Sequence, residues 1–253
     1  MTSDGPAADW RSAASYADLL RCDRRAFAWE WLRRSPVYRG LWSVRDRLPV
    51  HVPIRLGLLA WLDPSLAAPA ARPMWDSKTD PSVLDGHPSG EAADRRDLLD
   101  IRELASFVSV EIDESHTEHW LLSDGHWAVR LDLHDGTLLG GPILVEQRLT
   151  GLRAAAHRLD ALRRLIALSA RGDLPVSLRP RERRAAQWIL ELRVGDAIMG
   201  GAGQQEIARE LFSSSIAPRR WRLESASYRL RVQRLVRVAR RRLADPLNGP
   251  WFD

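Results

Sequence analysis

Residues 225–243 read SASYRLRVQRLVRVARRRL, and this run decides how the C-terminal part of the chain folds. Apolar residues recur in it every three or four positions. They are Val232, Leu235, Val236, Ala239 and Leu243. This spacing places them on one face of an α-helix, the face that packs against a core. The run therefore predicts a long helix with one buried stripe.

The opposite face of this predicted helix carries arginines at the same spacing. They are Arg234, Arg237 and Arg241, with Arg229, Arg231, Arg240 and Arg242 beside them. Like charges at this density destabilise an isolated helix. They become favourable beside DNA, where each neutralised phosphate releases counterions. We therefore expect this face to bind DNA; the alternative is a solvated surface helix.

A shorter helix is predicted immediately upstream, over residues 204–212, after a glycine-rich turn. It places Ile207, Ala208 and Leu211 on one face. The small residue at position 208 lets a neighbouring helix approach closely, as the first helix of a helix-turn-helix requires. The two predicted helices together therefore favour a helix-turn-helix-like unit.

Two geometries remain open for the helix that would read bases. A compact helix-turn-helix has a turn of about 3–4 residues, whereas residues 212–224 separate the two predicted helices. Recognition starts either at Ser225 or at Pro218, and the first residues of a recognition helix reach base edges. The candidate DNA-binding residues are Gln204, Gln205, Arg219, Arg220, Arg222, Ser225, Ser227, Tyr228, Arg229, Arg231 and Arg234.

Charge is segregated along the chain. Residues 1–150 carry 17 basic and 23 acidic side chains, a net charge of −6, whereas residues 151–253 carry 21 and 10, a net of +11. Arginine-rich codon usage explains why Lys78 is the only lysine, but it does not explain this segregation. The basic C-terminal third predicts a region that binds double-stranded DNA.

Length and composition indicate an ordinary globular protein. The chain has 253 residues, of which 45% are hydrophobic and 28% charged, enough for one large domain or two small ones. No apolar run approaches the roughly 18 residues needed to span a bilayer, and the first ten residues lack a secretion signal. Cys22 is the only cysteine, so no internal disulfide can form. These features favour a cytoplasmic protein with no membrane partner.

The N-terminal region predicts an amphipathic helix over residues 15–34. Ser15 is placed to cap it, and Asp18 lies in the first turn, where negative charge is favoured. Ser35-Pro36 then ends the helix. The apolar positions of this helix are Leu19, Leu20, Phe27, Trp31 and Leu32.

Tryptophans are concentrated in the same region, at Trp10, Trp29, Trp31 and Trp42. Because large aromatic side chains bury much apolar area, we interpret them as a small core. The alternative is a hot spot for a protein partner.

The middle of the chain changes from irregular to strand-like patterning. Residues 48–90 are rich in Pro, Ala and Asp and predict connecting structure. Over residues 104–147 apolar and polar residues alternate, which is the period of a β-strand. Asp124-Gly125 and Asp135-Gly136 lie between the alternating runs, and such pairs are strong hairpin signals. This segment predicts a small antiparallel β-meander.

The fold class that follows is α+β. It combines an N-terminal helical region, the β-meander and a C-terminal all-helical, helix-turn-helix-like domain. The expected domains are residues 1–90, 91–149 and 150–253. Helices are expected in the last of these at 151–170, 181–194, 204–212 and 225–243. Because these helices would supply apolar faces to one another, we expect residues 150–253 to fold alone.

Two groups of residues resemble a known family. The run AWEWLRRSPVYR at residues 28–39 resembles the N-terminal motif of bacterial regulators of integrative and conjugative elements. Gln205-Glu206-Ile207-Ala208, Leu211-Phe212, Trp221-Arg222 and residues 228–235 resemble the helix-turn-helix variant that follows it in those proteins. The chain is thus similar to the fused excision-activator proteins.

The resemblance implies a transcriptional activator that binds promoter DNA and switches on excision genes. It implies control by a small antiactivator protein, and RNA polymerase as a further partner. Ser213 and the tail at residues 248–252 depart from the family pattern. A protein-interaction module that antagonises another regulator, without binding DNA, is the alternative function.

Other chemistry finds little support in the sequence. His116 and His119 form an H-x-x-H pair, but a zinc site needs three or four ligands. Residues 200–203 read GGAG without a following Lys-Ser/Thr, so they are not a phosphate loop. No G-x-S-x-G elbow is present. We therefore expect no enzyme activity, metal or cofactor.

Overall fold

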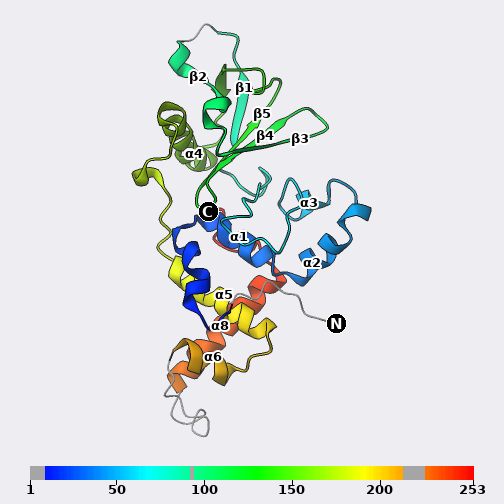
Figure 1. Cartoon of the computed structure of the whole chain (residues 1–253), viewed down its shortest axis with the longest axis vertical. Coiled ribbons are helices and arrows are strands. Elements are labelled where there is room, and N and C mark those ends of the chain that lie inside the picture. The colour runs from blue at the N-terminus through cyan, green and yellow to red at the C-terminus, as the bar shows by residue number, and fades with distance from the viewer. Residues whose placement is uncertain (1–8, 92–93, 213–225) are drawn as a thin grey trace.

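The computed structural model describes residues 9–91, 94–212 and 226–253. It is elongated, with a sheet at one end, helices α5, α6 and α8 at the other, and the N-terminal helices between them (Figure 1). Among the described helices, none combines the length and apolarity needed to cross a lipid bilayer. The α-helices are α1 Arg24–Leu32, α2 Pro36–Ser43, α3 Val52–Arg55, α4 Leu152–Arg171, α5 Ala185–Met199, α6 Gln204–Leu211 and α8 Ala226–Ala244.

Short 3₁₀ helices and six strands complete the described elements. The 3₁₀ helices are η1 Ala13–Arg21, η2 Arg45–Arg47, η3 Arg95–Asp97, η4 Ile101–Leu104 and η5 Val176–Leu178. The strands are β1 Leu84–Pro88, β2 Leu98–Leu99, β3 Val108–Ile112, β4 Glu118–Ser123, β5 Ala128–Leu133 and β6 Ile143–Gln147. All six strands join one sheet in the order β2-β6-β1-β5-β4-β3. The chain is therefore mixed α and β, and helices precede and follow the strand-containing segment in the sequence.

The sheet is larger than the predicted meander. Strands β3, β4 and β5 do pair antiparallel in sequence order, and the turn at Asp124-Gly125 joins β4 to β5. The prediction for the fourth strand was wrong: β6 pairs antiparallel with β1 and β2. Since β1 lies between β5 and β6, Asp135-Gly136 closes no hairpin between those two strands.

Strand β1 explains the difference, because it comes from the segment predicted to be irregular. It pairs parallel with β5, with Leu84 opposite Leu131. Its sequence, LDGHP, lacks strand-like alternation. A Cβ at Gly86 would lie 2.8 Å from Val145 Cγ1 and 2.9 Å from Leu131 Cδ1. Glycine therefore lets side chains of both neighbouring strands close over β1, a contact that local patterning does not reveal.

The helix predicted over residues 15–34 is two helices. A 3₁₀ helix, η1, precedes α1, and Asp23 lies between them. The Asp23 carboxylate accepts a hydrogen bond from Ala26 N at 3.2 Å, and Asp23 N donates to His126 O at 2.8 Å. Asp23 is thus the cap of α1. Ser15, the predicted cap, lies inside η1, so that prediction was wrong.

Two hydrophobic cores form. The sheet core contains α4, which buries Ala161, Leu165 and Leu168 against the strands. The helical core combines residues of the N-terminal region with α5, α6, α8 and the C-terminal tail. Within residues 150–253, α4 thus packs on the sheet and the later helices pack on N-terminal residues as well as on one another. Independent folding of residues 150–253 stays a prediction.

The tryptophans of the N-terminal region belong to the helical core. Trp29 and Trp31 are fully buried and Trp10 is nearly so, whereas Trp42 is half-buried. Phe27 packs edge-on against Trp188 of α5, with ring centroids 5.1 Å apart. The core interpretation of Trp10, Trp29 and Trp31 is therefore confirmed over the hot-spot alternative.

Candidate nucleic-acid interface

Helix α8 buries the stripe that its sequence predicts. Val232 and Ala239 are fully buried, and Leu235 and Val236 are 5% exposed. These side chains belong to the helical core, where α8 packs against α5 and α6. The buried stripe fixes which side of α8 faces outward.

The outward side of α8 carries the arginines. Arg231, Arg234, Arg237, Arg240 and Arg241 are exposed, and α8 contains no acidic residue. Among the described residues no ion pair joins an acid to Arg234, Arg237, Arg240 or Arg241, and their charges are uncompensated within this part of the chain. Such a face repels itself and attracts polyanions.

Aromatic contacts hold the start of α8 against the end of α6. The Arg231 guanidinium lies over the Phe212 ring, 4.2 Å from its centroid. Phe212 also stacks with Tyr228, with centroids 6.2 Å apart and ring planes 21° apart. A cation over an aromatic face is attracted by the ring quadrupole, so the first turns of α8 and the end of α6 are oriented together.

Helix α6 is set by the glycine turn and by a small buried residue. Gly201, two residues after the end of α5, has φ +79°, in the left-handed region that glycine adopts most readily. Ile207 and Ala208 are fully buried, as predicted, and α6 packs against α8. Thus α5, α6 and α8 form a three-helix unit in the described residues; the connection between α6 and α8 lies outside them.

The predicted DNA-binding residues fall into three groups. Gln204, exposed, and Gln205, half-buried, open α6. Ser227, Arg231 and Arg234 are exposed on α8, where Tyr228 and Arg229 are half-buried. The third group lies outside the described residues: Arg219, Arg220, Arg222 and Ser225. The two possible starts of the recognition helix, Ser225 and Pro218, also lie outside them. The role of each residue at DNA therefore stays a prediction.

A buried ionic network connects α1 to α5. Arg34 donates from Nε to Asp196 Oδ1 at 2.6 Å and from Nη2 to Asp196 Oδ2 at 2.9 Å. Arg34 also pairs with Glu30, and Tyr16 donates its hydroxyl to Asp196 Oδ2 at 2.5 Å. Arg33 donates to Glu30 Oε2 at 2.9 Å. These bonds fix the N-terminal region on α5, the helix that supports α8.

Electrostatics keep this network charged despite its burial. Burial by itself would raise the pKa of Glu30, but the adjacent Arg34 and Arg33 outweigh it and hold that pKa below its usual range. Burial and the Asp196 carboxylate raise the pKa of Tyr16, which stays a hydroxyl donor. Arg33 and Arg34 of the AWEWLRR run are 3% and 2% exposed. They therefore act inside the protein rather than at its surface.

Sequence reasoning missed this network and one further contact. Two signals in the sequence could have indicated a buried ion pair. Glu30 precedes Arg34 by four residues, and Asp196 is a single acid within an otherwise apolar stretch of helix. The further contact is at the end of α8, where the Arg242 guanidinium lies 4.6 Å from the centroid of the Trp251 ring and donates to Asn248 O. Arg242 thus contacts the C-terminal tail and is not part of the exposed arginine face of α8.

The two histidines of the H-x-x-H pair do not converge. His116 is exposed in the turn after β3. His119 lies on β4, with Nδ1 2.7 Å from Asp132 Oδ1 and Nε2 3.3 Å from Asp113 Oδ2. In the part of the chain that the structure describes, no group of three or more His, Cys, Asp or Glu side chains is arranged to hold a metal ion.

Comparison with known families yields two matches. Residues 9–47, which run from the start of the described chain through η2, match a proteobacterial transcriptional regulator-like domain. Residues 147–245, which run from the end of β6 through α8, match a T6SS transcription factor DNA-binding domain. No curated protein matches the chain. The two matches support a transcriptional regulator with a DNA-binding domain, and DNA as its partner.

The structure adds a physical detail to the second match. Within residues 147–245, α4 belongs to the sheet core, whereas α5, α6 and α8 belong to the helical core. The exposed arginine face lies on the last of these helices. The candidate nucleic-acid interface is therefore the α8 face, together with the start of α6.

Proposed function

We propose that this chain is a cytoplasmic transcriptional activator that binds promoter DNA and controls the excision and transfer genes of an integrative and conjugative element. The observation that carries the DNA-binding part is the acid-free arginine face of α8. The resemblance of residues 28–39 and of the C-terminal run supports the link to such elements. A small antiactivator and RNA polymerase are proposed as partners on that resemblance alone.

The dimensions of the face suit a DNA backbone. Arg231 and Arg241 are ten residues apart, which corresponds to about 15 Å along a helix. One DNA strand places a phosphate about every 3.4 Å along the axis, so the face can follow about four phosphates. Residues at the start of α8 would then reach base edges, and later turns would follow the backbone.

A gel shift on the chain's own promoter region tests DNA binding. The α8 face accounts for about four phosphates; if other basic residues of the C-terminal third raise the total to about six, affinity falls roughly 10³-fold between about 50 and 200 mM salt. A variant with Arg234, Arg237 and Arg241 changed to glutamine is expected to lose binding, whereas Arg171→Gln, an exposed arginine at the end of α4, serves as the control. A response that does not change with salt contradicts the proposed interface.

A reporter fused to the promoter of the element's excision genes tests the regulatory part. Expression of the chain is expected to raise reporter activity, and the triple glutamine variant is not. If the chain binds no duplex DNA but changes the output of another regulator, the protein-interaction module is the correct function.

A further inference from the structure

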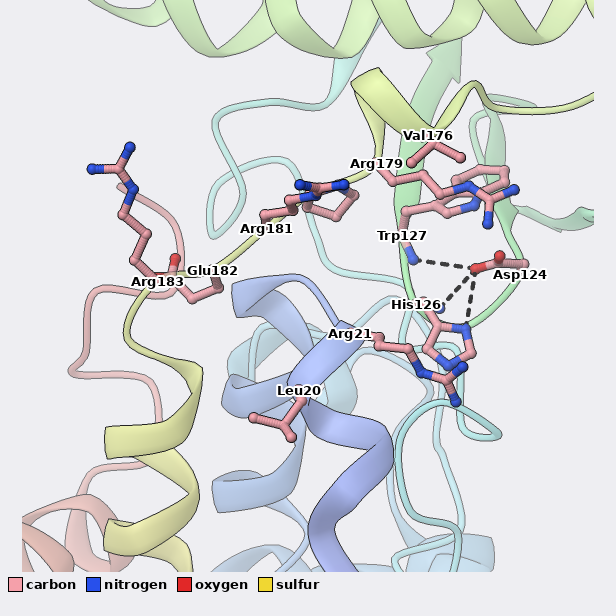
Figure 2. Close-up of a pocket in the computed structure, with 11 residues that line it drawn as sticks. Leu20, Arg21, Asp124, His126, Trp127, Val176, Arg179, Arg181, Glu182 and Arg183 are labelled. Atoms are coloured by element: carbon pink, nitrogen blue, oxygen red, sulfur yellow. Dashed lines mark hydrogen bonds and ion pairs between the residues drawn. The ribbon is translucent and has the colours of Figure 1, made fainter.

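A large pocket lies beside the segment that links α4 to α5. It has a volume of about 620 Å³, within the usual range for small-molecule sites. Three parts of the chain form its walls: η1, the turn between β4 and β5, and the linker at residues 176–183 (Figure 2). We call it the linker pocket, and its walls include Leu20, His126, Trp127, Val176, Arg181 and Arg183.

The charge of the linker pocket is unbalanced toward the positive. Its two acids are already engaged: Asp124 accepts from His126 N at 2.8 Å, and Glu182 pairs with Arg24 at 3.0 Å. Arg181 and Arg183 are exposed and have no ion pair with a described acid. In Figure 2 the two side chains diverge, and the guanidinium of Arg183 points away from the pocket. The pocket therefore offers the unpaired guanidinium of Arg181 to an anion.

The remaining walls suit a flat apolar body. Leu20 and Val176 are 54% and 61% exposed, large values for apolar side chains beside a cavity. Trp127 is 1% exposed, and its indole Nε1 is buried without a hydrogen-bond acceptor in the described chain. The buried Nε2 of His126 also has no partner there. Because both nitrogen atoms are buried, they offer no hydrogen bond to a ligand, and these walls favour an apolar body.

We propose that the linker pocket binds a small aromatic carboxylate as an effector. The carboxylate pairs with Arg181, and the ring lies between Leu20 and Val176. Arg181 also lines a second, polar cavity of about 240 Å³, so it stands at the boundary between the two. The carboxylate class follows from combining the unpaired guanidinium of Arg181 with apolar walls.

The position of the pocket connects binding to the DNA-binding face. The linker joins α4, in the sheet core, to α5, which supports α8 in the helical core. A ligand touching η1, the β4–β5 turn and the linker restrains how the two cores sit against each other. The effector role rests on the proposed function, whereas the binding itself does not.

Calorimetric titration of the full chain with 1-naphthoate tests the binding, with the neutral 1-naphthamide as the matched ligand. We expect saturable binding of 1-naphthoate, about tenfold tighter than the amide, because a charge-assisted bond is lost in the latter. Arg181→Gln is expected to weaken naphthoate binding about tenfold. Val176→Phe is expected to block it by filling the pocket from an exposed position.

Arg171→Gln, outside the pocket, is expected to leave the affinity for naphthoate unchanged. Absence of saturable binding, equal binding of the amide, or unchanged binding by both pocket variants would overturn the proposal. Gel shifts with and without 1-naphthoate separate the two claims. If naphthoate binds but DNA affinity stays constant, the effector role is wrong; if DNA is never bound, the proposed function fails while the titration still reports on the pocket.

Discussion

Two arginine-rich regions of this protein, the turn after α1 and the helix α8, use the same side chain in opposite ways. In the turn after α1, Arg33 and Arg34 are buried and each pairs with Glu30, and Arg34 also pairs with Asp196. On α8, the arginines from Arg234 to Arg241 are exposed, and that helix has no acidic residue. The first set stabilises the protein internally, whereas the second set is left to attract an external polyanion.

The difference teaches that arginine density alone does not identify a DNA-binding surface. A buried guanidinium requires a carboxylate within reach, because an unpaired buried charge is very unfavourable. An exposed arginine run without acids has no such internal partner and is screened only by solvent and salt. The four predictions below test this contrast, from the largest expected effect to the smallest.

The largest effect is expected for Arg34→Leu. This change leaves the carboxylates of Glu30 and Asp196 buried with fewer partners, which typically costs about 3–5 kcal/mol of unfolding free energy. Urea unfolding followed by far-UV circular dichroism measures it. Arg237→Leu, on the exposed face of α8, is the matched control and is expected to change stability by less than about 0.5 kcal/mol. Equal losses for the two variants would remove the contrast between the two regions.

A somewhat smaller effect is expected for Ala208→Asp. Ala208 is fully buried where α6 packs against α8, so the new carboxylate would have no partner. The expected loss is about 3 kcal/mol of unfolding free energy. Ala186→Asp, at an exposed alanine in the first turn of α5, provides the control. A wild-type thermal midpoint for Ala208→Asp would mean that α6 does not pack on α8 as described.

The exposed arginines are expected to divide by position along α8. If recognition starts at Ser225, Arg231→Ala lowers specific binding by about tenfold or more relative to random duplex, because base contacts discriminate. Arg241→Ala lowers specific and random binding alike, as a phosphate contact does. Competition assays with both duplexes measure the ratio.

The same assay distinguishes the rival geometry. If Arg219→Ala and Arg222→Ala relax specificity while Arg229→Ala and Arg231→Ala do not, recognition starts at Pro218. DNA binding by α8 would then be confined to the backbone.

The smallest effect concerns a third buried arginine, Arg130, which shares Asp132 with His119. Burial by itself lowers the pKa of His119, but Asp132 and Asp113 outweigh it and raise that pKa above 6.5. The folded pKa thus exceeds the unfolded one, so this contribution to stability is complete below about pH 6.5 and is lost as pH rises through the folded pKa. His119→Gln is expected to flatten that decline in pH-dependent urea unfolding. An unchanged profile would mean that Arg130 alone satisfies Asp132.

Much of the helical region followed from local pattern. The predicted helices at 204–212 and 225–243 match α6 and α8 within one residue at each end. Four of the five predicted stripe residues of α8 are buried, and the fifth, Leu243, is half-buried. Strand β1 could not be predicted in the same way, since LDGHP carries neither alternation nor a hydrophobic run. It becomes a strand because β5 and β6 lie on either side of it and Gly86 leaves room for their side chains.

In the candidate interface, too, some features follow from local sequence pattern and others only from tertiary packing. The sequence by itself determined the arginine face of α8 and the charge segregation, because helix periodicity relates residues only a few positions apart. The tertiary structure alone decided that Arg34 is internal, since its partner Asp196 lies 162 residues away. It also decided that the linker pocket exists, because three distant segments form its walls. Partners that meet only through packing leave no local period in the sequence, and so they emerge only when the cores assemble.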